Sequence, residues 1–134
     1  MSGLRLYKSE KLCSKIEIEK LYARGTSIIA YPLRAVWLEV PRDDWRHPVA
    51  ARFLISIPKK RIRHAVDRVL LRRRTREAYR LNRSFLDGVA QEGKTVLIGF
   101  NWLANHEYNY VTIERSMQEI LRKISSAIIQ EKEA

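Results

Sequence analysis

The segment from Ala65 to Leu86 constrains the fold more than any other part of the sequence, because its residues divide between two faces of a helix. At about 100° per residue, six basic side chains all fall within one arc of about 140°. They are Arg68, Arg72, Arg73, Arg76, Arg80 and Arg83. A separate arc of about 100° is apolar, with Leu70, Leu71, Ala78, Leu81 and Phe85. The pattern predicts a helix that buries one face in a core and presents guanidinium groups on the other.

The positive charge of the chain is concentrated around this helix. The 134 residues carry a formal net charge of +11. Residues 59–83 hold 11 basic and 2 acidic residues, whereas the other 109 residues hold 15 and 13. Lys59, Lys60, Arg61 and Arg63 extend the charge to the helix N-terminus, whose dipole attracts phosphate. So localised a charge indicates a docking surface for a polyanion.

The arginine face favours nucleic acid over bulk charge. A guanidinium fork matches two phosphate oxygens or a base edge and stacks on bases. The alternative is a solvated helix face stabilised by local ion pairs, and we expect the stripe to lack the acidic partners one turn away that such pairs need. An anionic membrane surface is a second alternative, which the use of the apolar face in a core disfavours. We expect neither a membrane nor a protein partner.

A first helix is predicted from Lys15 to Arg24. Ser14 followed by Glu17 is a capping-box pattern, which satisfies free amide groups at a helix start. Gly25 is expected to end the helix in the left-handed conformation. A lone cysteine, Cys13, excludes an intrachain disulfide and a Cys-rich zinc site and is typical of a reducing compartment, so we expect a cytoplasmic protein.

Three strands and a last helix complete the predicted elements. Residues 33–40 and 51–57 are rich in β-branched and aromatic side chains, and the proline-bounded turn 41–48 predicts that they form an antiparallel hairpin. Residues 95–100 predict a short buried strand. Apolar periodicity over residues 113–129 predicts the last helix. We therefore expect one α+β domain, a sandwich of order α-β-β-α-β-α whose small sheet is covered by helices on one face.

The whole chain, 1–134, is interpreted as a single RNA-binding domain with flexible termini at 1–12 and 130–134. The N-terminus lacks the apolar stretch of a signal peptide, and no apolar run is long enough for a membrane span. No motif for catalysis by the protein is present, because Asp43 and Asp44 lie in a turn without further ligands nearby. His64 has no ligand spacing with His47 or His106 and is expected to face solvent or RNA.

The basic segment resembles the signature of the bacterial ribonuclease P protein component. The resemblance rests on Pro58-Lys59-Lys60 after a strand, Ala65-Val66 opening a helix, then Arg68, Arg72-Arg73, Arg76-Glu77 and Arg80. The segment 16–25, IEIEKLYARG, is similar to the first helix of the family, and the order of elements agrees. The chain departs from the family where Val69 and Leu70 replace Asn and Arg, where Arg72 replaces Lys and where Asn101 replaces a basic residue.

The resemblance implies a protein subunit that helps a catalytic RNA to remove the 5′ leader from precursor tRNA. It implies that Mg²⁺ is held mainly by that RNA and that the protein has no catalytic residue. The implied RNA contacts are Lys59, Lys60, Arg61, Arg63, Arg68, Arg72, Arg73, Arg76, Arg80 and Arg83. The family also implies a left-handed crossover and a cleft for the leader, lined by Ile18, Tyr22 and Trp37.

Two alternatives remain open at this point. The aromatic pair Tyr22 and Trp37 suits stacking on single-stranded RNA, but aromatic residues on apolar faces are more often core residues. A ribosomal or other structural RNA-binding protein, without a role in cleavage, fits the charge and the size equally well.

Overall fold

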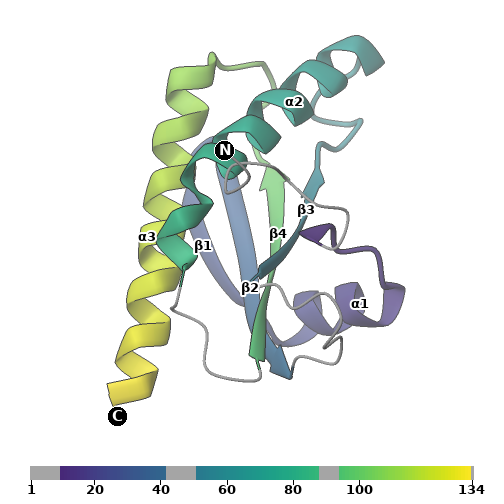
Figure 1. Cartoon of the computed structure of the whole chain (residues 1–134). Coiled ribbons are helices and arrows are strands. Elements are labelled where there is room, and N and C mark those ends of the chain that lie inside the picture. The colour runs from purple at the N-terminus through teal and green to yellow at the C-terminus, as the bar shows by residue number, and fades with distance from the viewer. Residues whose placement is uncertain (1–9, 42–50, 88–93, 134) are drawn as a thin grey trace.

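A four-stranded sheet with helices on both faces forms the domain (Figure 1). The computed structural model describes residues 10–41, 51–87 and 94–133. In chain order the elements are α1 (Lys15–Arg24), β1 (Thr26–Ala30), β2 (Leu33–Pro41), β3 (Ala51–Ser56), α2 (Ala65–Asn82), the 3-10 helix η3 (Arg83–Leu86), β4 (Lys94–Trp102) and α3 (Tyr110–Glu133). The α+β class and the predicted order are confirmed, with one strand, β1, added.

The strand order is β1-β2-β4-β3, with β1, β2 and β4 antiparallel and β3 parallel to β4. The predicted hairpin of β2 with β3 is therefore wrong, because β4 lies between them. Residues 95–100 of β4 are all buried, as a central strand covered on both faces requires. The prolines marked where the strands end but carried no information on which strands pair. Most of the turn 41–48 lies outside the described residues.

The chain passes from β3 through α2 to the parallel strand β4. With α2 in front of the sheet, as in Figure 1, both strands point up and β4 lies to the left of β3. This connection is left-handed, as the family resemblance implies, and is an exception to the usual right-handed rule.

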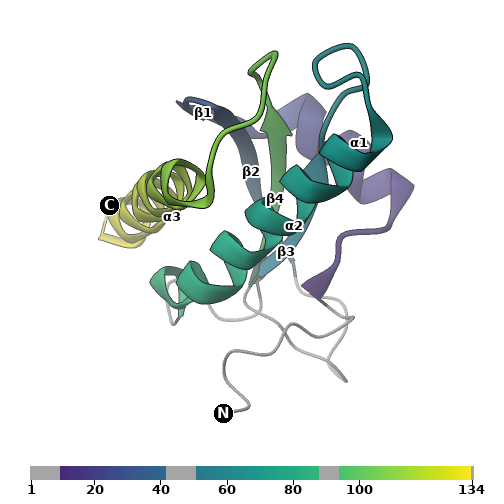
Figure 2. The same ribbon diagram turned by 90° about the horizontal axis from the view of Figure 1, so that it is seen from above.

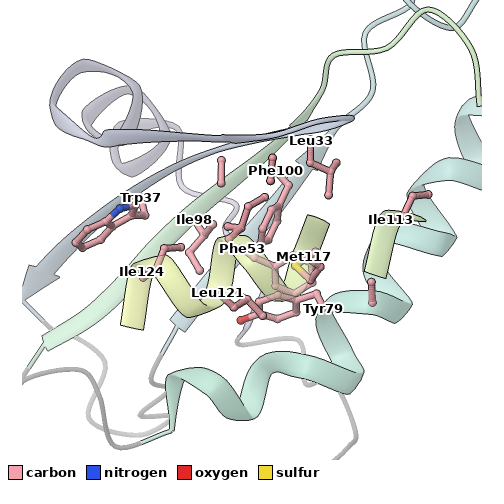
Figure 3. Close-up of a cluster of buried hydrophobic side chains, with 14 of the residues drawn as sticks. Leu33, Trp37, Phe53, Tyr79, Ile98, Phe100, Ile113, Met117, Leu121 and Ile124 are labelled. Atoms are coloured by element: carbon pink, nitrogen blue, oxygen red, sulfur yellow. The ribbon is translucent and has the colours of Figure 1, made fainter. Parts of the chain in front are cut away.

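The helices cover both faces of the sheet, not one as predicted: α2 and α3 lie on one side and α1 on the other (Figure 2). Alternation along β2 explains this, since successive side chains point to opposite faces. Leu33, Ala35 and Trp37 enter the larger core under α2 and α3, which includes Phe100 and Met117 (Figure 3). Val36 and Val40 enter a smaller core under α1, and Leu38 packs against it.

Gly25 follows α1 in an extended conformation, with φ −71° and ψ 160°, so the predicted left-handed stop is wrong. A close approach explains the glycine instead. A Cβ atom there would lie 2.4 Å from the carbonyl oxygen of Leu21 and 2.5 Å from Val36 Cγ1. The predicted cap is confirmed, since Ser14 Oγ accepts a hydrogen bond from the Glu17 amide at 3.4 Å.

Packing and helical structure extend into both of the terminal segments that the sequence predicts to be flexible. Glu10 and Leu12, expected in a flexible terminus, are buried, and the Leu12 amide donates to the Phe53 carbonyl at 2.8 Å. Helix α3 begins at Tyr110 and extends to Glu133, beyond the predicted end at residue 129. Residues 1–9 and 134 lie outside the described residues. No helix among the described segments is both long enough and apolar enough to cross a bilayer.

Candidate nucleic-acid interface

Six basic residues of this segment are exposed, and their side chains make no hydrogen bond or ion pair with the described part of the chain. We call them the free cations: Lys59, Lys60, Arg63, Arg72, Arg73 and Arg76. Three lie on the outer face of α2 and three in the loop that precedes it. Their charge is not neutralised within this part of the fold, so the surface is suited to a polyanion.

Two further cations of the predicted set hold the loop before α2 in place. The guanidinium of Arg68 donates to the carbonyl oxygens of Ile62 and Arg63, at 3.0 and 2.9 Å. Arg61 Nη1 donates to Asn105 Oδ1 at 3.3 Å and so joins this loop to the segment between β4 and α3. Both side chains are half-buried.

The last two arginines of the stripe are paired with carboxylates. Arg80 donates to both carboxylate oxygens of Glu77, at 2.5 and 3.0 Å, and this hydrogen bonding lowers the pKa of Glu77. Arg83 forms an ion pair with Glu10. The expectation that the stripe lacks acidic partners is therefore wrong at this end. Glu77 lies on the same helix, three residues before Arg80. Glu10 is 73 residues from Arg83, so inspection of the helix sequence alone could not identify it as the partner.

Arg74, which projects toward the apolar side of α2, also has a structural partner. Its Nη1 donates to the Tyr108 carbonyl oxygen at 2.7 Å and lies 4.0 Å from Glu107 Oε2. The side chain thus extends out of the core to the segment between β4 and α3, as long basic side chains often do.

On the other face of the sheet, Tyr22 of α1 lies against β4. Its hydroxyl donates to Asn101 Oδ1 at 3.1 Å, and the absence of a side chain at Gly99 makes room for it, since a Cβ there would lie 2.5 Å from the Tyr22 oxygen. Tyr22 is 40% exposed. Ile18, one turn earlier, is half-buried against the smaller core.

Trp37 does not belong with Ile18 and Tyr22. It is 6% exposed and part of the larger core, on the opposite face of the sheet. The cleft implied by the family therefore cannot include Trp37, because a shift of one residue along a strand moves a side chain to the other face. Val36 is the neighbouring β2 residue that does face α1.

Two polar residues on the α1 face, Arg52 and Asn101, were not predicted as site residues. Arg52 of β3 lies with Nη1 3.7 Å from Glu17 Oε1. Within the described residues, Arg52 Nε and Asn101 Nδ2 are buried without a hydrogen-bond acceptor. Such donors cost about 1–3 kcal/mol each when left unpaired, so an acceptor supplied by a ligand would relieve them. The sequence offered one sign of this site, because Arg52 is a charged residue within the largely apolar strand β3.

A metal site is not built from the described residues, in which no three His, Cys, Asp or Glu side chains gather at ligand distance. Cys13 is exposed, and its thiol is free. His64 and His106 are both exposed.

Fold and surface together define a small α+β protein whose arginine-rich helix, on a left-handed crossover, presents cations to a polyanion. The model of the Ribonuclease P family matches residues 6–125, so the chain belongs to this family. Three curated relatives carry the description ribonuclease P protein component, and two of them are from strains of Porphyromonas gingivalis. One from Porphyromonas gingivalis is 38% identical over 92% of this chain and 88% of its own length. The one from Chlorobium phaeobacteroides is 32% identical over 75% and 71%.

Solved structures show the same fold. The ribonuclease P protein of Staphylococcus aureus superposes with a TM-score of 0.62 over 87% of this chain and 96% of that protein, at 18% sequence identity. At the position where the family resemblance expects Asn, this chain has Val69, which is 44% exposed.

Proposed function

We propose that this chain is the protein subunit of a ribonuclease P ribonucleoprotein and assists its RNA subunit in cutting the 5′ leader from precursor tRNA in the cytoplasm. The observation that carries the proposal is the set of six free cations on α2 and its preceding loop, in a chain that belongs to this family. Exposed cations replace counterions along an RNA backbone, and the release of those counterions favours binding.

In this proposal the chemistry belongs to the RNA. Mg²⁺, held mainly by the RNA subunit, would supply the Lewis acid for hydrolysis of the phosphodiester bond. The protein contributes cationic charge that lowers the concentration of Mg²⁺ needed to keep two polyanions, the RNA subunit and the precursor, together. Of the predicted RNA contacts, Arg61, Arg68, Arg80 and Arg83 act mainly by holding the loop and the end of α2 in shape.

The leader of the precursor is proposed to bind on the α1 face, beside Ile18 and Tyr22. Tyr22 is exposed enough for a base to stack on it, and stacking of this kind is tolerant of sequence. The unpaired donors of Arg52 and Asn101 would bind phosphate or base oxygens. These two residues take the place of Trp37 in the site.

Reconstitution tests the proposal. The purified protein is added to the RNA subunit of the same genome, and cleavage of a precursor tRNA is followed across a range of Mg²⁺ concentrations. We expect the protein to restore cleavage at Mg²⁺ concentrations where the RNA alone is inactive. Unchanged cleavage at low Mg²⁺ would refute the proposal, and recovery of ribosomal RNA alone with the protein from cells would favour a structural RNA-binding role instead.

A further inference from the structure

Four aromatic rings form a connected series at the end of the sheet where β4 leads to α3. Trp102, buried at 1% exposure, lies 6.1 Å from Tyr108 between ring centroids. The Tyr108 ring in turn lies 4.8 Å from His106, with 33° between their planes, and 5.9 Å from Tyr31 in an edge-on arrangement. The series thus runs from the core to two exposed rings, His106 and Tyr31.

Hydrogen bonds fix the segment that carries these rings. Arg74 holds the Tyr108 carbonyl at 2.7 Å, and Arg61 holds the Asn105 side chain at 3.3 Å. The Leu103 amide donates to the Pro32 carbonyl at 2.9 Å. The backbone that carries His106 is therefore held in place before any ligand arrives, and the His106 ring lies against Tyr108. A stacked ligand thus has less of this segment to order.

His106 lines a hollow of about 380 Å³ between the segment 105–107 and the start of α2. The other lining residues are Arg61, Ile62, Arg63, His64, Asp67, Asn105 and Glu107. The volume is within the range of small-molecule sites in proteins. The ring of His106 makes no hydrogen bond with the described residues, and its contact with Tyr108 leaves it exposed at the hollow.

The charges around the hollow distinguish between possible ligands. Asp67 and Glu107 both line it, so a bare phosphate would meet two carboxylates there. A nucleobase fits better, because its face can stack on an imidazole ring and its N–H groups can donate to carboxylate or amide oxygens. Arg63, one of the free cations, stands at the same hollow and is suited to the phosphate of that nucleotide.

We infer that this hollow binds one unpaired nucleotide of an RNA, with the base stacked on His106 and read by Asp67 or Glu107, and with its phosphate at Arg63. The inference rests on the proposed function for the partner, an RNA that also contacts α2. This contact would recognise a base of the RNA, whereas the other proposed contacts of this surface are with the RNA backbone.

Chemical probing of the bases of the RNA subunit, with and without the protein, tests this contact. The wild-type protein should protect one or two unpaired bases that His106→Ala leaves reactive and His106→Phe protects again, because Phe retains the stacking face. His106→Ala should also weaken binding of the RNA subunit by about five-fold or more. The dependence of binding on salt should stay the same, because stacking of a ring on a base displaces no counterions from the RNA backbone.

Three outcomes would overturn the inference. They are a His106→Ala footprint identical to the wild type, a failure of His106→Phe to restore protection, and a shallower salt dependence for His106→Ala. In each case the rest of the footprint, over the nucleotides that the free cations contact, would leave the proposed function standing. A wild-type protein without any footprint on this RNA would refute both.

Discussion

Arg83 and Glu10 form an ion pair that joins the end of α2 to the segment before α1, across 73 residues of sequence. Their side chains are 14% and 11% exposed. A pair so far from solvent is a structural contact, because a nucleic acid cannot reach the guanidinium without breaking it. The arginine stripe therefore has two parts, one that maintains the fold and one, at Arg72, Arg73 and Arg76, that is available to a partner.

Replacing Arg83 should lower stability rather than RNA binding. Arg83→Ala removes the guanidinium from a mostly buried carboxylate, and we expect the free energy of unfolding to fall by about 1–3 kcal/mol. Urea unfolding followed by circular dichroism measures this. Arg72→Ala serves as the control and should change the free energy of unfolding by less than about 0.5 kcal/mol. Equal stability of the two variants would contradict a structural role for Arg83.

The double variant Arg72→Ala, Arg76→Ala should show the opposite behaviour. Each exposed guanidinium that contacts a phosphate contributes about one unit to the slope of log K against log salt. We therefore expect the slope for the RNA subunit to become shallower by up to about two units, with the thermal midpoint unchanged. Arg115→Ala, which removes an exposed arginine from α3, is the matched control and should retain the slope. A wild-type slope in the double variant would contradict the assignment of the α2 face to the RNA interface.

The sequence predicted well those features that depend on local pattern. The bounds of α1, the extent of the arginine helix including its 3-10 continuation, and the buried strand near residues 95–100 all follow from periodicity and capping. The fold class and the left-handed crossover were also predicted, the latter through the family resemblance alone. In all of these cases the relevant interactions are local or belong to a known motif.

Features that depend on contacts across the chain were not predicted. The pairing of β4 between β2 and β3 is decided by burial on both faces, which residues 51–57 do not reveal. Glu10 is too distant in sequence to be recognised as the partner of Arg83. Trp37 was placed on the wrong face because its register against β4, opposite Ile98, is a property of the sheet. One residue of register separates the face of the sheet under α2 and α3 from the face under α1.

Tyr22 provides the test of the leader site. Tyr22→Ala should raise the concentration of precursor needed for half-maximal cleavage, and the effect should be larger for precursors with long leaders than for those with one leader nucleotide. Tyr22→Phe removes only the hydrogen bond to Asn101 and keeps the stacking face, so it should behave nearly as the wild type. The measurement is steady-state cleavage over a series of leader lengths. An effect of Tyr22→Ala that is independent of leader length would contradict the assignment.

The two glycines near α1 should respond differently to alanine. At Gly25 the added Cβ would lie 2.4 Å from the backbone oxygen of Leu21, which cannot move without distorting α1. We expect Gly25→Ala to lower the free energy of unfolding by about 1–3 kcal/mol, as overpacking does. At Gly99 the nearest atom is the hydroxyl oxygen of Tyr22, at 2.5 Å, which lies at the far end of a side chain that can rotate away.

Gly99→Ala should therefore displace the Tyr22 ring with a smaller loss of stability than Gly25→Ala. Because the ring is the proposed stacking surface, Gly99→Ala should reproduce the leader-length dependence of Tyr22→Ala although Tyr22 itself is unchanged. The double variant Gly99→Ala, Tyr22→Ala should show little more loss of long-leader cleavage than either single variant, since both substitutions remove the same contact. Parallel urea unfolding and cleavage assays measure both quantities. Wild-type cleavage of long-leader precursors by Gly99→Ala, together with a crystal structure in which Tyr22 has moved, would show that the ring does not bind the leader.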